Sequence, residues 1–139
     1  MSRILALDHG TKRIGVAVSD ELKMIAQPLE FIPTAPHAAF LARLKQILAE
    51  KEVELVFVGM PRNLDGTFGP AAQKVREFIA GLTPEISVPI RTLDERLTSA
   101  QANRVLLAGN VRRADRKQKV DAMAAAILLQ SHLDARSET

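Results

Sequence analysis

The sequence predicts an α/β domain with a mixed five-stranded sheet and helices packed on it. Three apolar segments joined by short polar turns come first, which is typical of an antiparallel meander. Helical and extended patterns then alternate, and this alternation indicates crossover connections and parallel pairing of the later strands. We therefore expect the order βββαβαβαα in a single domain over residues 1–139.

The meander is predicted from two apolar runs around a polar turn, followed by a third extended segment. Arg3–Leu7 and Arg13–Ser19 have the length and β-branched content of buried strands, with the turn at 9–12 between them. Ile25–Ile32 follows as the third strand. Pro28 cannot donate a hydrogen bond to a neighbouring strand, so this strand is expected at an edge of the sheet.

The first helix and the fourth strand form the first crossover. Apolar residues recur at helical spacing over His37–Lys51, which predicts an amphipathic helix. The strand Val53–Val58 is apolar without alternation in its second half, as expected of a central parallel strand. It ends at Gly59-Met60-Pro61.

A helix over Ala71–Leu82 and a fifth strand over Val88–Leu93 form the second crossover, and this strand leads directly into Asp94-Glu95-Arg96. Two further helices are predicted, over Ser99–Leu107 and over the alanine-rich Arg116–Leu133. We expect a basic linker over 112–119 and a frayed tail over 135–139.

Several classes of protein are disfavoured by what the composition lacks. The chain has no cysteine, which excludes disulfides and thiolate zinc sites, and His9, His37 and His132 do not have zinc-ligand spacing. No apolar run approaches the length of a membrane span, and the first residues lack the layout of a signal peptide. These features favour a cytoplasmic protein with no membrane partner.

Positive charge is concentrated in one segment. Residues 91–119 contain eight Lys and Arg against three Asp and Glu, while residues 1–90 contain ten of each. Such a basic segment is typical of a protein that binds a polyanion. The alternative is a solvated helix face, which is common for short charge runs.

Acidic residues occur at three places that the predicted fold can bring together. Asp8 ends the first strand and Asp94-Glu95 follows the fifth, so both lie at the carboxyl ends of neighbouring parallel strands. Asp121 borders the apolar face of the last helix. Taken singly, Asp8 can be a turn cap and Asp121 can complement the helix dipole. Taken together, they favour a carboxylate cluster.

A cluster of carboxylates suits Mg²⁺ or Mn²⁺, which support hydrolysis of phosphodiester bonds. With five Phe and no Trp or Tyr, recognition of backbone and shape is favoured over base stacking. Nearby cations can hold the flanking phosphates, although each alone can be an ordinary surface charge. The candidates for nucleic-acid binding are Lys12, Arg13, Arg62, Arg96, Arg112, Arg113, Arg116, Lys117 and Lys119.

Four ordered motifs resemble the YqgF/RuvX family of bacterial proteins with an RNase H-like fold. They are Leu7–Ala17, Val58–Pro61, Asp94–Ser99 and Lys119–Ala125, and the resemblance covers nearly the whole chain. It implies the sheet order 3-2-1-4-5 with the second strand antiparallel, which matches the order of elements derived above.

The resemblance implies a metal-dependent endonuclease acting on structured nucleic acid, with trimming of the 5′ end of 16S rRNA precursor as its role. It implies Asp8, Glu95 and Asp121 as catalytic residues and metal ligands. Asp94 is the alternative for the middle position. Many RNase H-like nucleases carry that acid on the fourth strand, where this chain has Gly59-Met60-Pro61.

Alternative functions are a Holliday-junction resolvase acting on branched DNA and a nucleic-acid-binding module without catalysis. Actin-like and sugar-kinase ATPases share the Asp-x-Gly-Thr turn but need a second RNase H-like domain, for which 139 residues are too few. The sequence does not fix the oligomeric state, and a homodimer is among the states we consider.

Overall fold

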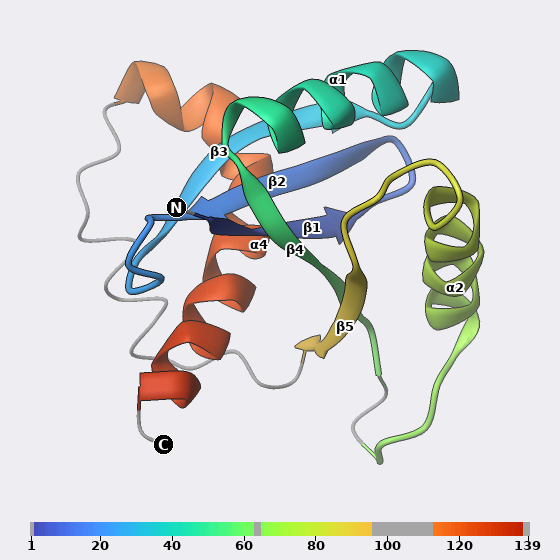
Figure 1. Ribbon diagram of the computed structural model, residues 1–139. Helices are drawn as coiled ribbons and strands as arrows, with labels where there is room; N and C mark the ends of the chain where they lie inside the picture. Colours follow the sequence, from blue (N-terminus) through green and yellow to red (C-terminus); the bar gives the residue numbers. More distant parts are fainter. Residues whose placement is uncertain (1, 63–64, 96–112, 138–139) are drawn as a thin grey trace.

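The computed structural model describes residues 2–62, 65–95 and 113–137, with only the backbone described for 113–121 and 136–137. A five-stranded sheet in the order β3-β2-β1-β4-β5 forms its centre (Figure 1). The elements in chain order are β1 Arg3–His9, β2 Arg13–Ser19, β3 Ala26–Pro33, α1 His37–Glu50, β4 Val53–Met60, α2 Pro70–Leu82, β5 Ile90–Asp94 and α4 Arg113–Ser137.

The strand pairing confirms the predicted sheet. β1 pairs antiparallel with β2 and parallel with β4, and β4 pairs parallel with β5. β3 pairs antiparallel with β2 at the edge, where Pro28 was expected. The carboxyl ends of β1, β4 and β5 therefore meet at one end of the sheet, which is where open α/β sheets bind ligands.

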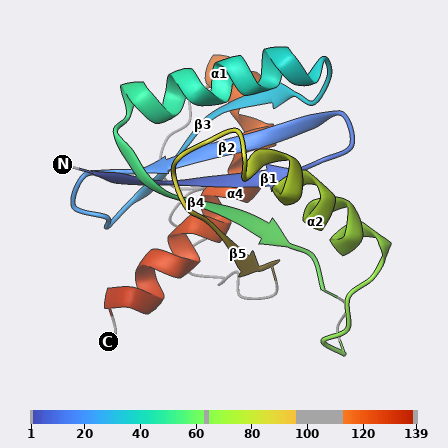
Figure 2. The same ribbon diagram turned by 45° about the vertical axis from the view of Figure 1, so that its right-hand side comes forward.

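Helices cover both faces of the sheet. α1 and α2 lie on one face and α4 crosses the other (Figures 1 and 2). Because side chains alternate along a strand, Leu5 and Leu7 pack in the core beneath α1 and α2, while Ile4 and Ala6 pack against α4. None of the described helices combines the length and the apolarity needed to cross a bilayer.

The alanine residues of α4 bring this helix close to the sheet. Ala122, Ala125 and Ala126 are fully buried, and the last two pack against Phe57 of β4. Burial of this face anchors α4 across β3, β2 and β1. The helix thus covers the side of the sheet to which the even-numbered residues of β1 point, Asp8 included.

The structure corrects the two ends of the last helix. The helix begins at Arg113, three residues before the predicted start at Arg116, so a linker is wrong for 113–115 and the basic run over 116–119 is helical as the helix prediction had it. The predicted frayed tail is wrong for 135–137, which are also helical. The segment 113–137 lacks Gly and Pro and is rich in good helix formers, which explains the continuous helix. β5 begins at Ile90 rather than Val88, since Pro89 has no N–H for the ladder. The helix predicted over Ser99–Leu107 lies outside the described residues.

Candidate active site

Two carboxyl groups meet at the carboxyl end of the parallel strands. Asp8 comes from β1, and Glu95 directly follows β5, so the sheet brings together residues that are far apart in the sequence. The two carboxyl groups hydrogen-bond each other. A carboxyl–carboxyl hydrogen bond requires a proton on one partner, and a pair of this kind strongly disfavours the doubly ionised state.

The electrostatics of the pair follow from burial and mutual repulsion. Burial, the charge of Asp8 and the hydrogen bond to Asp8 raise the pKa of Glu95 to about 7, and Asp94 adds to the shift. Burial also raises the pKa of Asp8, against the hydrogen bond from Glu95 and the nearby His9, which lower it. The shared proton is therefore held by Glu95 and donated to Asp8, in a place where a cation can replace it.

This shared proton predicts a loss of stability with rising pH in the metal-free protein. Glu95 binds its proton more tightly in the folded state, so the free energy of unfolding falls as the pH rises from its ordinary pKa of 4.5 to about 7. Discounted for partial exposure, we expect a loss of about 1 kcal/mol. Chemical denaturation of Glu95→Gln and wild type, from about pH 5 to about pH 8 in EDTA, measures it as a widening advantage of the variant.

The comparison of variants also removes an opposing contribution. Burial lowers the pKa of His9, so His9 favours folding as the pH rises. His9 is present in both proteins, and its contribution cancels in the difference. A difference that stays constant across this pH range would show that Glu95 is not protonated in the folded protein near neutrality.

Gly59 of β4 makes room for Glu95. A Cβ atom built on Gly59 would lie 2.9 Å from Glu95 Oε1 and 2.8 Å from Leu128 Cδ2 of α4. In many RNase H-like nucleases this strand, β4, carries an acid. Here Gly59 has no side chain, and the carboxyl group of Glu95, which follows the neighbouring strand β5, occupies the space beside it.

The geometry distinguishes the roles of Asp94 and Glu95, whereas the sequence left open which of the two faces Asp8. Asp94 Oδ2 pairs with Arg62 Nη1 at 3.3 Å, whereas Glu95 bonds to Asp8. Arg62 also donates two hydrogen bonds to the carbonyl oxygen of Gly66, at 3.0 and 2.6 Å. Asp94 and Arg62 therefore hold the loop after β4, and Glu95 is the acid that faces Asp8.

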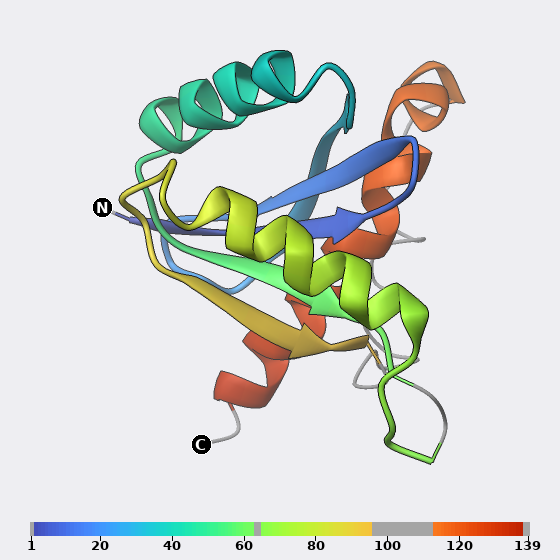
Figure 3. The same ribbon diagram turned by 90° about the vertical axis from the view of Figure 1, so that its right-hand side faces the viewer.

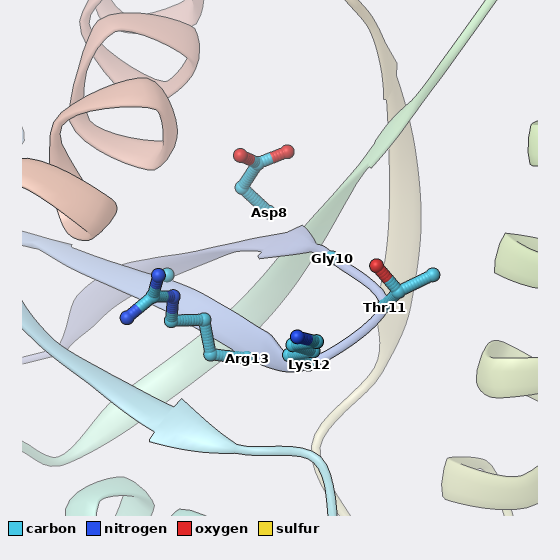
Figure 4. A pocket seen from close by; sticks show the side chains of 6 residues that line it. Asp8, Gly10, Thr11, Lys12 and Arg13 are labelled. Atoms are coloured by element: carbon cyan, nitrogen blue, oxygen red, sulfur yellow. The ribbon is translucent and has the colours of Figure 1, made fainter.

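The turn after Asp8 depends on Gly10. Its N–H donates to the Arg13 carbonyl oxygen at 3.0 Å, and a Cβ atom on Gly10 would lie only 2.6 Å from that oxygen. With Asp8, the turn residues Thr11, Lys12 and Arg13 line an open pocket of about 310 Å³ (Figure 4). Lys12 and Arg13 are both exposed, so two predicted phosphate-binding residues lie beside the carboxyl pair.

A second cleft, of about 350 Å³, contains both Asp8 and Glu95 and is bounded by Pro61, Pro70 and Lys74. Lys74 lies near the start of α2, whose first turn has no acidic residue. Lys74 is not among the cations predicted from the sequence, because only the packing of α2 brings it next to Asp8 and Glu95. One feature of the sequence could have indicated Lys74: it follows Gly69-Pro70 by a few residues, near the start of the helix that comes after the fourth strand.

We expect Lys74→Gln to weaken substrate binding about three- to tenfold at low salt and to leave folding intact, since Lys74 is exposed. Loss of one phosphate contact should also reduce the slope of log affinity against log salt by about 0.7–0.9. Lys45→Gln, a change on the exposed surface of α1, is the matched control. Filter binding over a salt series distinguishes the two, and equal slopes would assign Lys74 to the solvated surface.

The remaining predicted site residues are only partly described. Asp121, Arg113, Arg116, Lys117 and Lys119 lie on the backbone of α4, but their side chains are outside the described residues, as are Arg96 and Arg112 altogether. Among the described side chains, no group of three His, Cys, Asp or Glu could hold a metal. The role of Asp121 as the third ligand stays a prediction.

Comparisons with known proteins agree with this geometry. The chain matches T. thermophilus RuvC in complex with Holliday junction substrate with a TM-score of 0.59 and 19% identity, over 99% of this chain and 96% of that one, which confirms the RNase H-like fold. It is 43% identical over 136 residues to a "Putative pre-16S rRNA nuclease" of Halothermothrix orenii, covering 98% of this chain and 97% of the relative.

A protein of the same name from Symbiobacterium thermophilum is 47% identical over 135 residues, covering 97% of this chain and 94% of that relative. The model of the RuvX family, described as Holliday junction resolvase, matches residues 2–135. The resemblance of the sequence motifs is thereby confirmed, and the chain belongs to the RuvX family.

Proposed function

We propose that this protein is an endonuclease that uses Mg²⁺ or Mn²⁺ to hydrolyse phosphodiester bonds in structured nucleic acid. The observation that carries the proposal is the hydrogen-bonded pair of Asp8 and Glu95 at the carboxyl end of β1 and β5. Structural carboxylates are seldom buried against each other, because their repulsion costs stability unless a cation or proton compensates it.

The chemistry of the pair fits a divalent metal ion. Both groups offer carboxylate oxygens, which Mg²⁺ and Mn²⁺ prefer. Burial and the charge of Asp8 raise the pKa of Glu95 to about 7, and a bound cation would relieve that repulsion. Asp8 and Glu95 would hold the metal, with Asp121 as the proposed third ligand. A bound ion supplies the charge that stabilises the transition state and lowers the pKa of the attacking water.

The surrounding cations would bind the substrate. Lys12 and Arg13 line one pocket at Asp8, and Lys74 lines the cleft that contains Asp8 and Glu95, so a phosphate backbone bound at the pair would meet positive charge from both. Contacts of this kind fix the register of the strand and carry no base sequence. Further phosphate contacts are proposed for Arg62, Arg96, Arg112, Arg113, Arg116, Lys117 and Lys119.

The proposed substrate is the 5′ end of 16S rRNA precursor, in the cytoplasm. The support comes from the two relatives named as pre-16S rRNA nucleases, at 43% and 47% identity over nearly the full chain. The family description as Holliday junction resolvase supports branched DNA as the second candidate. A homodimer is compatible with either substrate.

Cleavage assays separate these candidates. The protein is incubated with an RNA spanning the leader and the 5′ end of 16S rRNA, and with a four-way DNA junction, in Mg²⁺, Mn²⁺ or EDTA. We expect metal-dependent cleavage of the RNA near the mature 5′ end. Cleavage of the junction alone would favour the resolvase, and binding without cleavage in every metal would favour the non-catalytic module.

Metal binding can be measured without activity. Because the metal must displace the shared proton, titration with Mn²⁺ below about pH 7 should release protons, which calorimetry in two buffers of different ionisation enthalpy detects. Glu95→Gln should lose this release. Binding of Mn²⁺ with unchanged proton release in the variant would place the metal elsewhere.

A further inference from the structure

Phe68 is the exposed phenylalanine of this protein. Phe68 is 46% exposed, whereas Phe40 and Phe57 are buried, with exposed fractions of 1% and 4%. Two arginines lie against its ring: Arg62 Cζ is 4.5 Å and Arg76 Cζ is 4.7 Å from the ring centroid. We call Arg62, Phe68 and Arg76 the Phe68 cluster.

The loop that carries Phe68 is held in place by specific contacts. Asp65 Oδ1 accepts hydrogen bonds from the Thr67 N–H at 2.9 Å and the Thr67 hydroxyl at 2.6 Å. Gly66 adopts a φ of 90°, which an L-residue rarely adopts, and its carbonyl oxygen accepts from Arg62. The exposed ring thus sits on an ordered segment, although burial would be favoured by the hydrophobic effect.

The Phe68 cluster adjoins the carboxyl pair. Arg62 pairs with Asp94, which directly precedes Glu95. Pro61 and Pro70, on either side of this loop, line the cleft that contains Asp8 and Glu95. In Figure 3 the described part of the loop before α2, residues 65–69, lies beyond the carboxyl ends of the strands at the lower right. A strand bound across the carboxyl pair can therefore reach the cluster.

We propose that the Phe68 cluster is a stacking site for an unpaired base next to the cleaved bond, an inference that rests on the proposed nuclease function. Aromatic rings and guanidinium planes both stack on bases, and the two arginines add charge for the phosphates. Bases inside a duplex already stack on each other, so the site selects a substrate that is single-stranded or splayed at this point. In this proposal, stacking on one base adds to the recognition of backbone and shape that the composition favours.

A single tryptophan tests stacking directly. The chain has no Trp, so Phe68→Trp introduces the only indole, at an exposed position that tolerates it. In EDTA, which prevents cleavage, a single-stranded oligoribonucleotide should quench its fluorescence, and a blunt duplex of the same sequence should quench it much less. Leu22→Trp, at a 71% exposed position on the β2–β3 turn, is the control and should not respond.

Affinity provides the second readout. Phe68→Ala should weaken binding of the single strand about 5- to 100-fold and binding of the duplex less than about twofold, while Phe68→Tyr keeps both. An unquenched indole, or equal losses for both substrates, would overturn the stacking site. Quenching in a protein that cleaves neither RNA nor DNA would refute the nuclease proposal and retain the stacking site. Cleavage at the same rate in Phe68→Ala and wild type would retain the nuclease proposal and refute the stacking site.

Discussion

Asp8→Asn is expected to reduce metal-dependent cleavage at least about a thousandfold while stabilising the metal-free protein above neutral pH. Loss of a metal ligand removes several kcal/mol of transition-state stabilisation, which corresponds to this factor. In the metal-free protein the same change removes the negative charge that raises the pKa of Glu95. Folding then no longer forces two carboxylates together, and the free energy of unfolding should rise by about 1 kcal/mol near pH 8.

Single-turnover cleavage and thermal unfolding, each with and without Mn²⁺, test both halves of this expectation. Wild type should gain stability from Mn²⁺ because the ion binds only the folded state, and Asp8→Asn should gain much less. Glu50→Gln removes a negative charge from the exposed end of α1 and should leave activity and metal response as in wild type. Activity that survives both Asp8→Asn and EDTA would refute the carboxylate–metal mechanism.

The opposite signs of the two effects identify a functional pair. Changing a residue that only stabilises the fold lowers the free energy of unfolding. Changing Asp8 should raise it in the metal-free protein, because the fold holds Asp8 and Glu95 together against their repulsion. In the proposed metal site, this repulsion is what a bound cation would relieve. Retained activity with reduced stability would mean that Asp8 caps the turn, the simpler interpretation of its position in the sequence.

The fold could be predicted from the sequence because its determinants are local. Apolar runs, helical spacing and Pro28 specify the strands, the helices and an edge, and right-handed crossovers leave few ways to join them. The exception is the segment 113–115, where a run of charges indicated a linker although Arg and Ala favour a helix. Helix propensity was the better guide there than charge.

The carboxyl pair could be predicted only in part. Strand ends indicated Asp8 and either Asp94 or Glu95, but the choice between these two neighbours depends on Gly59 and Arg62, which come from other segments of the chain. Lys74 and Phe68 were missed for the same reason. Their sequence neighbourhoods are ordinary. Only the packing of α2 brings Lys74 into the cleft with Asp8 and Glu95, and only the fold places Phe68 between Arg62 and Arg76.

Gly59→Ala should reduce cleavage about 10- to 100-fold while costing only about 1 kcal/mol of stability. The added methyl group would lie within 3 Å of Glu95 Oε1 and Leu128 Cδ2, closer than real contacts allow. Both atoms are the ends of flexible side chains, so the backbone can stay in place while the carboxyl group of Glu95 moves away. We expect even a small displacement of this carboxyl group to reduce catalysis strongly, because metal ligands require accurate positions.

Gly81→Ala in α2 is the matched control, since a Cβ atom at this position would meet nothing within 4 Å and alanine favours a helix. It should keep full activity and gain up to about 1 kcal/mol. In Gly59→Ala the proton release on Mn²⁺ binding should also fall, because Glu95 no longer shares a proton with Asp8. Full activity in Gly59→Ala would contradict the assignment of Glu95 as a ligand, because Glu95 Oε1 must shift to make room for a β-carbon at position 59. Loss of activity, loss of proton release and near-wild-type stability together would identify Gly59 as the residue that lets β5 supply the acid that β4 lacks.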